Sequence, residues 1–327
     1  MSHRVRIAGT GSYVPERVLT NADLERIVET TDEWIRTRTG IGERRIAAEG
    51  EATSDMAAAA GRRACEAAGI SPEDLDLIIV GTFTADRPLP SCACETQAKL
   101  GAVQAAAFDL AAACSGFIYG LACGVGFITS GQMERVLVIG AEKLSSVTDY
   151  EDRATCVLFG DGAGAAVLVP SDDDSGVLWT QLGADGTGAD LMYISAGGSR
   201  SPITHEAIDA RDQFVKMRGN ETFKFAVSAM KRCVEEAMAA ADLSIEDVGM
   251  IVPHQVNTRI IDAAIRRLGV PVESIALNIE QYGNTSAASA PIALDEYVRA
   301  GRIVKGDNVI LVAFGGGLTW ATAVLRW

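Results

Sequence analysis

The sequence predicts an α/β fold made of two copies of one helix–strand unit. Segment 67–80 (AAGISPEDLDLIIV) recurs 173 positions later as segment 240–253 (AADLSIEDVGMIVP), with six of the fourteen positions identical. Segment 136–140 (VLVIG) recurs at the same offset as segment 309–313 (VILVA). Apolar runs without alternation, which are typical of strands covered on both faces, alternate with helix-like stretches in both copies. Each copy should therefore form a mostly parallel sheet covered by helices.

The first copy shows the alternation from its first strand onward. That strand ends in the segment 9–11 (GTG), but residue 14 is valine, so the GxGxxG fingerprint of a dinucleotide site is not completed. The polar segment 172–175 separates the two copies, which gives an N-terminal half over 1–174 and a C-terminal half over 175–327. Strands are expected over 4–8, 75–80, 105–110 and 135–140, and helices over 54–68 and 117–129.

The second copy repeats this order. A strand over 250–253 leads to Asn257, which is expected to cap a helix over 258–268, because asparagine accepts a hydrogen bond from a free N–H of the first turn. A helix over 287–300 and a strand over 309–314 complete the copy.

Composition limits the classes of function. The net charge of −14 argues against a nucleic-acid partner or an anionic membrane surface. The seven cysteines are an odd number, and no signal peptide precedes the first strand, which predicts free thiols in a cytoplasmic protein. Cys92 and Cys94 form a lone C-x-C pair, so no metal site is expected. The uncharged run 110–133 is long enough to span a bilayer, but its glycines favour a helix buried in the protein.

Cys114 lies where a predicted strand ends and a predicted helix begins, within the segment 111–116 (AAACSG). A helix N-terminus carries roughly half a positive charge, which lowers the pKa of a thiol and favours the nucleophilic thiolate. A buried structural cysteine is the alternative, because free cysteine is among the most buried residue types. Cys114 is thus a candidate nucleophile that needs support from other motifs.

The duplication suggests a partner for Cys114. Moved by 170 positions, Cys114 falls on Asn284, in a second turn over 281–286 (QYGNTS) that precedes a predicted helix. The second helix begins with small residues, and one face of the first helix carries Gly116, Gly120 and Gly124. Small faces let helices approach closely, so the two helices are expected to pack together and to bring Cys114 near Asn284.

Histidine and glycine supply further candidates. His3 is terminal and His205 lies in a polar loop, whereas His254 ends an apolar strand, where ligands gather in α/β proteins. Gly316 belongs to the triple glycine 315–317, which permits a close approach of the backbone to a ligand and offers N–H groups to an oxyanion.

Four motifs in this order resemble those of β-ketoacyl-[acyl-carrier-protein] synthase III, the initiating condensing enzyme of dissociated fatty acid synthesis. They are the segments 112–116 (AACSG), 253–257 (PHQVN), 283–289 (GNTSAAS) and 314–320 (FGGGLTW). The resemblance covers the whole chain and implies a thiolase-like, five-layer αβαβα fold. Papain-like proteases also carry Cys, His and Asn in this order, at a similar spacing of the first two, but the local motif around Cys114 differs from theirs.

The resemblance implies a two-stage reaction without a cofactor, in which acyl-CoA is a substrate. Cys114 would take the acyl group from acyl-CoA, with the N–H groups of Cys114 and Gly316 binding the oxyanion. His254 and Asn284 would then donate hydrogen bonds to the malonyl thioester carried by acyl carrier protein. These bonds stabilise the enolate formed as carbon dioxide leaves, and the enolate attacks the Cys114 thioester.

Further roles follow from matching positions. Leu89 stands where acetyl-selective members have phenylalanine and would reach the acyl pocket of the partner subunit in a homodimer. An exposed basic face of Lys224, Arg259, Arg266 and Arg267 is expected to dock the acidic carrier protein. The residues matched to coenzyme A and acyl-tunnel contacts are Trp34, Arg38, Arg153, Phe159, Gly219, Asn220, Phe223 and Asn257.

The sequence leaves the acyl primer and several alternative functions open. The acyl primer could be acetyl, a longer linear chain or a branched chain. A related condensing enzyme of secondary metabolism, which uses coenzyme A substrates alone, is the nearest alternative function. A Cys-His-Asn protease and a non-catalytic acyl-CoA-binding protein are more remote.

Overall fold

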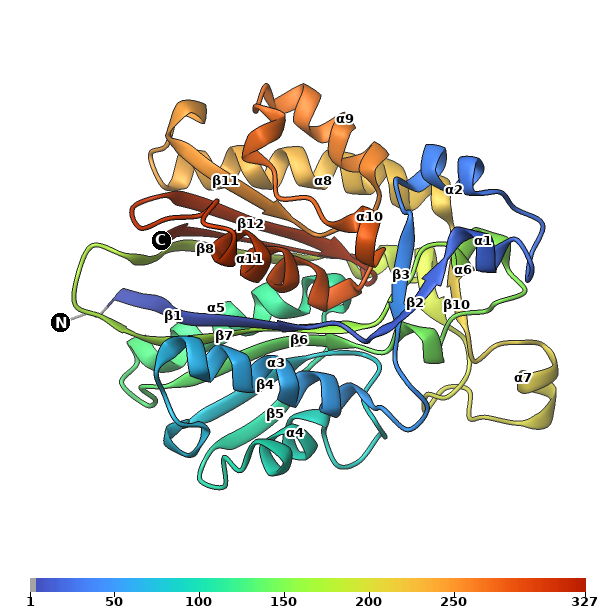
Figure 1. The fold of residues 1–327 in the computed structure, drawn as a ribbon, viewed down its shortest axis with the longest axis horizontal. Coiled ribbons are helices and arrows are strands. Elements are labelled where there is room, and N and C mark those ends of the chain that lie inside the picture. Colours follow the sequence, from blue (N-terminus) through green and yellow to red (C-terminus); the bar gives the residue numbers. More distant parts are fainter. Residues whose placement is uncertain (1–3) are drawn as a thin grey trace.

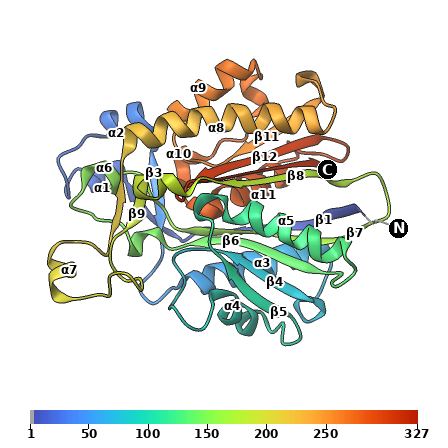
Figure 2. The same cartoon turned by 180° about the vertical axis from the view of Figure 1, so that it is seen from behind.

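The computed structural model describes residues 4–327, so His3 lies outside the described residues. The chain forms five layers: helices, a sheet, a central pair of helices, a second sheet and a last layer of helices (Figures 1 and 2). The thiolase-like, five-layer prediction is therefore confirmed.

The first sheet has five strands in the order β1-β7-β6-β4-β5. Strand β4 pairs in parallel with both β5 and β6, whereas β7 runs antiparallel to β6 and β1. The strands are β1 (Arg4–Tyr13), β4 (Leu77–Gly81), β5 (Ala106–Leu110), β6 (Val136–Glu142) and β7 (Gly162–Ser171).

The second sheet has four strands in the order β11-β12-β13-β8, and only the β11–β12 pair is parallel. The expectation of mostly parallel sheets is therefore wrong. The turn between β12 and β13 spans three residues, and so short a connection can join only antiparallel strands. The strands are β8 (Gly176–Ala184), β11 (Val248–Pro253), β12 (Asn308–Gly315) and β13 (Thr319–Arg326).

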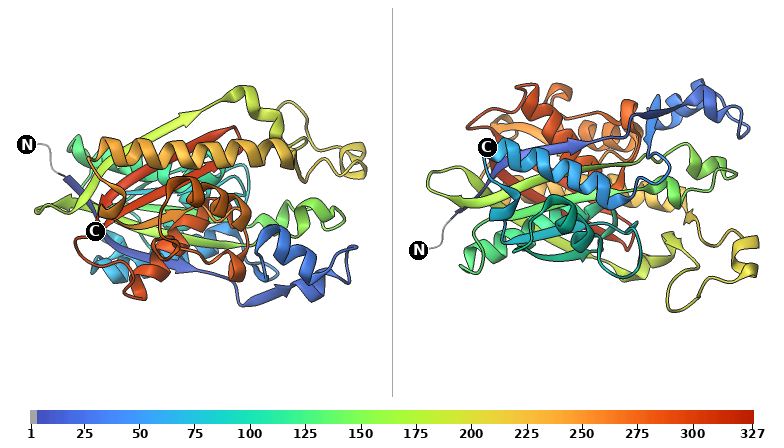
Figure 3. Two further views of the ribbon diagram at one scale, coloured as in Figure 1. Left: turned by 90° about the horizontal axis from the view of Figure 1, so that it is seen from above. Right: turned by 60° about the horizontal axis from the view of Figure 1, so that its bottom comes forward.

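Helices cover both faces of each sheet because their apolar residues lie on one side. In α9 (Thr258–Leu268), Ile260, Ile261, Ala264 and Ile265 are buried, while the arginines face solvent. Asn257 caps this helix, as predicted, by accepting a hydrogen bond from the Arg259 N–H at 2.9 Å. The outer helices of the second sheet are α8 (Gly219–Ala240) and α9, and those of the first are α3 (Thr53–Ala68) and α4 (Cys92–Leu100) (Figure 3).

The central layer holds α5 (Gly116–Thr129) and α11 (Ser289–Arg299). The glycine face of α5 was expected to pack on the second central helix, and this expectation is wrong beyond the first turn. A Cβ at Gly120 would meet Val138 and Ile79, and one at Gly124 would meet Leu168, so these glycines lie against the first sheet.

Among the described residues, no helix is long and apolar enough to cross a membrane.

The duplication is visible in the turns as well as in the strands. The 3₁₀ turns Pro72–Asp74 and Ile245–Asp247 lie 173 positions apart, and so do Ala113–Ser115 and Ser286–Ala288. At this offset Cys114 corresponds to Ala287, so the predicted equivalence of Cys114 and Asn284 at an offset of 170 is wrong. The two turns nevertheless meet: a Cβ at Gly116, the residue after the first turn, would lie 3.4 Å from the Ala287 Cβ. The second turn also rests on β6, where a Cβ at Gly140 would lie 2.1 Å from the Ala287 carbonyl oxygen, so only glycine permits this approach.

The remaining elements project at one end of the layers, to the right in Figure 1. The Arg44 side chain, fully buried, joins β3 to the residue after α6 by donating to the Val157 carbonyl at 2.8 Å. The division of the chain at residue 174 stays a prediction; β7 ends at Ser171 and β8 begins at Gly176. The projecting elements are β2 (Arg17–Thr20), α1 (Asn21–Leu24), α2 (Asp32–Thr39), β3 (Glu43–Ile46), α6 (Arg153–Cys156), β9 (Met192–Ile194), α7 (His205–Asp209), β10 (Val215–Met217) and α10 (Ile279–Tyr282).

Candidate active site

A cavity of about 290 Å³ lies where the two central turns meet the projecting elements. Its walls are mostly apolar, and Cys114, His254 and Asn284 all line it. A larger and more open groove, between β1 and β13, contains none of the predicted site residues. The small cavity is therefore the candidate active site.

Cys114 sits in a strained turn at the start of α5. Ala113 has a φ of 46°, in the left-handed region that costs a non-glycine residue energy, and the 3₁₀ turn Ala113–Ser115 then leads directly into the helix. A Cβ at Gly81 would lie 2.6 Å from the Gly116 carbonyl carbon, so glycine at the end of β4 lets the helix start rest on the sheet. The strand-to-helix position expected for Cys114 is confirmed.

The ionisation of Cys114 differs from the expectation. Burial raises the pKa of the thiol to about 12, and the neighbouring Glu142 carboxylate acts in the same direction. A hydrogen bond with Ser286 opposes this shift without cancelling it. The resting side chain is therefore a thiol rather than the predicted thiolate, because burial disfavours the charged form.

His254 lies at the end of β11 and is buried. Burial lowers the pKa of its imidazole to about 3, so the ring is neutral near pH 7. Its Nδ1 lies 2.6 Å from the Ser289 hydroxyl oxygen, which also accepts a hydrogen bond from the Gln255 N–H at 3.3 Å. With one N–H already donated to it, the hydroxyl is suited to donate to Nδ1. When the hydroxyl donates to Nδ1, the ring proton is on Nε2 and the opposite edge of the ring is a hydrogen-bond donor.

Asn284 is held by its neighbours on both sides. Its backbone N–H donates to the Leu158 carbonyl at 2.9 Å, and its carbonyl accepts from the Gly160 N–H at 3.1 Å. Its side-chain Oδ1 accepts from the Ser286 N–H at 2.9 Å. The amide oxygen is thus occupied, and the NH₂ group is the end of the side chain available to a ligand.

The triple glycine forms the turn from β12 to β13 beside the nucleophile. A Cβ at Gly315 would lie 2.7 Å from the Cys114 backbone nitrogen and 3.1 Å from its Cβ, so no larger residue fits there. The Thr319 hydroxyl donates to the Ala112 carbonyl at 2.9 Å and fixes this turn on the Cys114 turn. Gly316, the next residue of this turn, lines the cavity.

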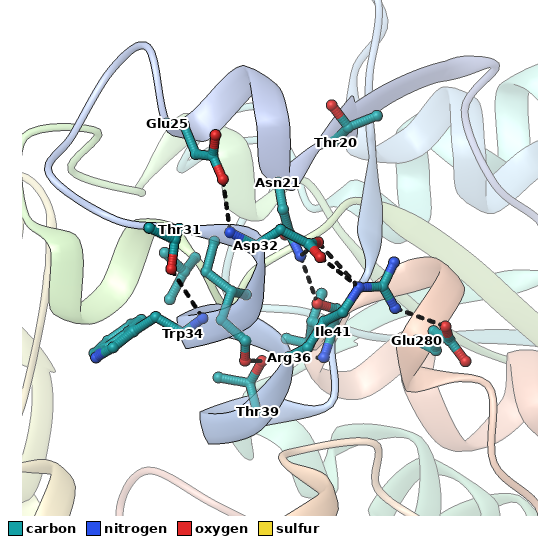
Figure 4. Close-up of polar contacts among 12 residues, drawn as sticks. Thr20, Asn21, Glu25, Thr31, Asp32, Trp34, Arg36, Thr39, Ile41 and Glu280 are labelled. Carbon is teal, nitrogen blue, oxygen red and sulfur yellow. Dashed lines mark hydrogen bonds and ion pairs between the residues drawn. The ribbon is translucent and has the colours of Figure 1, made fainter.

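Helix α2 contributes Trp34, Arg38 and Thr39 to the cavity wall. Arg153 and Arg38 lie over the Trp34 ring, with their guanidinium carbons 5.1 and 5.7 Å from its centroid. Figure 4 shows that the Trp34 side chain points away from the polar cluster that fixes α2, in which Arg36 pairs with Asp32 and with Glu280. The Trp34 ring is therefore covered by the two guanidinium groups and lies outside the polar cluster that fixes α2.

The structure brings most of the predicted residues to this cavity, but not all of them. Asn220 and Arg153 are not among its lining residues. Asn220 follows Gly219 in the chain and Arg153 stacks on Trp34, and both Gly219 and Trp34 line the cavity. Leu89 does not line it either, and 85% of its surface is exposed. The basic residues lie outside on α8 and α9, where Arg259 stacks on Phe223 at 5.8 Å. The predicted residues that line the cavity are Trp34, Arg38, Cys114, Phe159, Gly219, Phe223, His254, Asn257, Asn284 and Gly316.

Sequence reasoning missed the residues behind the candidate set. Ser289 positions His254, and Ser286 and Glu142 lie behind Cys114. Ser286 and Ser289 were visible within the GNTSAAS motif, but nothing in the sequence showed which side chains they would meet. Met192 and Met217, from the two-stranded sheet β9–β10, complete the apolar wall.

Fold and site together define the class of protein. A duplicated five-layer fold places a cysteine at one central helix start, with a histidine and an asparagine from the other half beside it. This arrangement is that of the condensing acyltransferases of the thiolase-like superfamily. The chain belongs to the β-ketoacyl-[acyl-carrier-protein] synthase III family.

Comparisons with known proteins establish this membership. Residues 108–186 match the family described as 3-oxoacyl-[acyl-carrier-protein] synthase III, and residues 238–327 match its C-terminal part. The chain is 54% identical over 321 residues to the β-ketoacyl-[acyl-carrier-protein] synthase III of Caldanaerobacter subterraneus, covering 98% of this chain and 97% of that protein.

Two solved structures superpose closely on this chain. The crystal structure of 3-oxoacyl-[acyl-carrier-protein] synthase III from Aquifex aeolicus superposes with a TM-score of 0.91 at 48% identity, covering 99% of this chain and all of the other. The priming β-ketosynthase of a polyketide biosynthetic pathway superposes with a TM-score of 0.92 at 38% identity, covering 99% of this chain and 97% of that protein.

Proposed function

We propose that the chain moves an acyl primer from coenzyme A to Cys114 and condenses it with a malonyl group carried by acyl carrier protein. The products are 3-oxoacyl-acyl carrier protein and carbon dioxide, the first condensation of fatty acid synthesis. The observation that carries this assignment of roles is that Cys114, His254 and Asn284 line one cavity next to the triple glycine. Acyl-CoA takes part in this reaction as a substrate rather than as a cofactor.

In the first stage the Cys114 sulfur attacks the acyl thioester. Negative charge develops on the carbonyl oxygen, and backbone N–H groups of Cys114 and Gly316 are the donors proposed to stabilise it. The close contact of Gly315 with Cys114 supports this role, because it fixes the two backbone segments relative to each other.

In the second stage His254 and Asn284 hold the malonyl thioester carbonyl. The Nε2–H of His254 and the amide of Asn284 donate to the oxygen that becomes the enolate as carbon dioxide leaves. Both donors are neutral, since the pKa of His254 is lowered to about 3, so neither supplies a proton that would quench the enolate. The enolate then attacks the Cys114 thioester.

The function is tested by following the mass of the intact protein after mixing with a panel of acyl-CoAs. The acyl-CoA that gives a covalent adduct identifies the primer, and later addition of malonyl-acyl carrier protein should remove the adduct and produce 3-oxoacyl-acyl carrier protein. Turnover of malonyl-CoA in place of malonyl-acyl carrier protein would instead favour the alternative function in secondary metabolism. Release of free acid without condensation would contradict both.

Trp34 and Arg153 are proposed to hold the adenine of coenzyme A between them. Trp34→Ala should raise the KM for acyl-CoA about tenfold with little change in kcat, because base stacking is worth roughly 1–3 kcal/mol and is made equally in ground and transition states. Steady-state acylation kinetics measure this effect. Trp34→Phe should recover most of the affinity, and an acyl-pantetheine without the nucleotide should react equally with all three proteins. An equal loss with acyl-pantetheine would rule out adenine stacking.

The exposed face of Lys224, Arg259, Arg266 and Arg267 is proposed as the carrier-protein site. Its position supports this proposal, because Arg259 stacks on Phe223 at the cavity wall. Reversing the charges of Arg266 and Arg267 to glutamate should lower kcat/KM for malonyl-acyl carrier protein about tenfold at low salt, and less at high salt, since rim charges act mainly on association. Acylation of Cys114 by acyl-CoA should not change.

A charge-matched control for this prediction is the double variant Arg62→Glu/Arg63→Glu, which reverses two exposed arginines on another helix. Arg62 lies on α3, which covers the opposite side of the molecule from α9 (Figure 1). If this control reduces the reaction with carrier protein as strongly as reversal of Arg266 and Arg267 does, the effect comes from net charge and the docking face is wrong.

A homodimer is proposed on the evidence of two exposed features. Strand β5 lies at an edge of the first sheet, with β4 its only partner among the described strands. Leu89 lies exposed between β4 and α4 and so is available to a partner subunit, where it would bound the acyl pocket. Unpaired edge strands are frequent sites of association. A cytoplasmic location stays a prediction.

A further inference from the structure

We propose, building on the acylation of Cys114 put forward above, that Glu142 takes up the proton of the Cys114 thiol through the Ser286 hydroxyl. The same path returns the proton when condensation frees the Cys114 sulfur. Glu142 contacts no substrate in this proposal and acts through Ser286.

The two oxygens of the Glu142 carboxylate have different surroundings. Glu142 ends β6 and is fully buried. One oxygen, Oε2, accepts hydrogen bonds from the Thr82 hydroxyl at 3.1 Å, the Phe83 N–H at 3.3 Å, the Thr84 N–H at 3.2 Å and the Thr84 hydroxyl. The other, Oε1, accepts only from the Ser286 hydroxyl at 3.2 Å among the described residues. The oxygen with spare capacity therefore faces Ser286.

Ser286 connects this oxygen with the nucleophile. It begins the second-half turn Ser286–Ala288. Its hydroxyl donates to the Glu142 carboxylate, and its side chain lies beside the Cys114 thiol, whose pKa it lowers. Its backbone has a φ of 50°, in the left-handed region, and its N–H donates to the Asn284 Oδ1. A strained backbone held in this way keeps the hydroxyl between thiol and carboxylate.

The attack of Cys114 needs a proton acceptor that the proposed site otherwise lacks. The sulfur must lose its proton as it bonds to the acyl carbon, and the resting thiol has a raised pKa. His254 is a poor base because its pKa is lowered to about 3. Burial raises the pKa of Glu142 to about 7, which is near the value that suits a general base at neutral pH.

The atoms and charges of the cycle balance with this acceptor. In the first stage the sulfur–acyl bond forms, the acyl–sulfur bond to coenzyme A breaks, the thiol proton moves to Glu142, and the coenzyme A thiolate takes a proton from solvent. In the second stage the enolate carbon bonds to the acyl carbon and the Cys114–acyl bond breaks. The released Cys114 thiolate then regains the proton from Glu142, and both groups return to their starting states.

The charged surroundings of Glu142 are consistent with this role. The titratable groups near its carboxylate are the thiols of Cys114 and Cys92, on the turn before α5 and on α4. Lys143, the next residue, directs its ammonium to the Glu51 carbonyl at 2.6 Å. The pKa of Glu142 is therefore set by burial and by hydrogen bonds from hydroxyl and N–H groups.

The experiment measures single-turnover acylation of the full-length protein from pH 5.5 to 9, with acetyl-CoA or the panel member that forms the adduct. In the wild type the rate should rise through pH 7, because Glu142 accepts a proton only when ionised. Glu142→Gln should acylate on the order of 10²-fold more slowly at pH 8 and lose this rise. Ser286→Ala should do the same with the carboxylate still present, which keeps the proposal testable if Glu142→Gln does not fold.

The direction of the change in acylation rate separates a proton relay from a purely electrostatic effect of the Glu142 carboxylate. The Glu142 charge raises the pKa of Cys114, so a carboxylate that acted only through its charge would give faster acylation in Glu142→Gln. Thr82→Val is the matched control: it removes one hydrogen bond that lowers the pKa of Glu142, so it should move the rise to higher pH without abolishing it. An unchanged or faster Glu142→Gln, or a Ser286→Ala variant with a normal pH profile, would overturn the relay. Absence of any adduct in the wild type would instead refute the proposed nucleophile.

Discussion

Replacing Cys114 with alanine should abolish the covalent acyl adduct and lower condensation by on the order of 10⁴-fold or more. The effect is this large because Cys114 is the only thiol among the described residues that line the cavity, and loss of a nucleophile removes the whole covalent path. Intact-protein mass after incubation with acyl-CoA measures the adduct directly. The cavity should still bind acyl-CoA, so protection against thermal unfolding by the ligand should persist in the variant.

The control for this prediction is Cys94→Ala, because Cys94 is an exposed thiol that could react nonspecifically. Its adduct should be indistinguishable from that of the wild type. A persistent adduct in Cys114→Ala would show that another residue is the nucleophile. Binding without an adduct in the wild type would indicate a non-catalytic acyl-CoA-binding protein.

Replacing His254 or Asn284 with alanine should separate the two stages. Each variant should still form the acyl adduct at Cys114, but should decarboxylate malonyl-acyl carrier protein about 10²–10³-fold more slowly, as expected when one donor to a developing oxyanion is removed. Release of carbon dioxide and intact-protein mass report the two stages independently. Because the pKa of His254 is lowered to about 3, decarboxylation by the wild type should show no change near pH 6.5 from a histidine.

His205→Ala is the matched control for His254, since His205 begins the projecting helix α7, away from the cavity. It should retain both stages. If His254→Ala and Asn284→Ala decarboxylate at the wild-type rate, these residues do not hold the malonyl carbonyl. If they lose acylation as strongly as decarboxylation, they serve the first stage as well.

The helices, the strands and the candidate site were largely predictable from local patterns. Asn257 caps α9 because an asparagine side chain acts on the N–H groups next to it in the chain. Cys114 was placed correctly at a helix start because the change from strand to helix pattern is local. The motifs around His254 and Asn284 identified the family because each is a short contiguous segment.

Other predictions failed because they depended on which segments pack together. The glycines of α5 show that a helix face must approach something closely, but they do not show that the neighbour is the first sheet. The direction of a strand is likewise set by how the chain returns to the sheet, and the three-residue turn from β12 to β13 makes that pair antiparallel.

The sequence by itself determined the duplicated α/β architecture, the family, and the identities of Cys114, His254 and Asn284 as candidate residues. Only the tertiary structure decided their electrostatic states, because the pKa of a side chain depends on how much water is removed from it. Burial raises the pKa of Cys114 and lowers that of His254. Folding also joins Glu142 and Ser286, which are 144 positions apart in the chain, by a hydrogen bond behind the nucleophile.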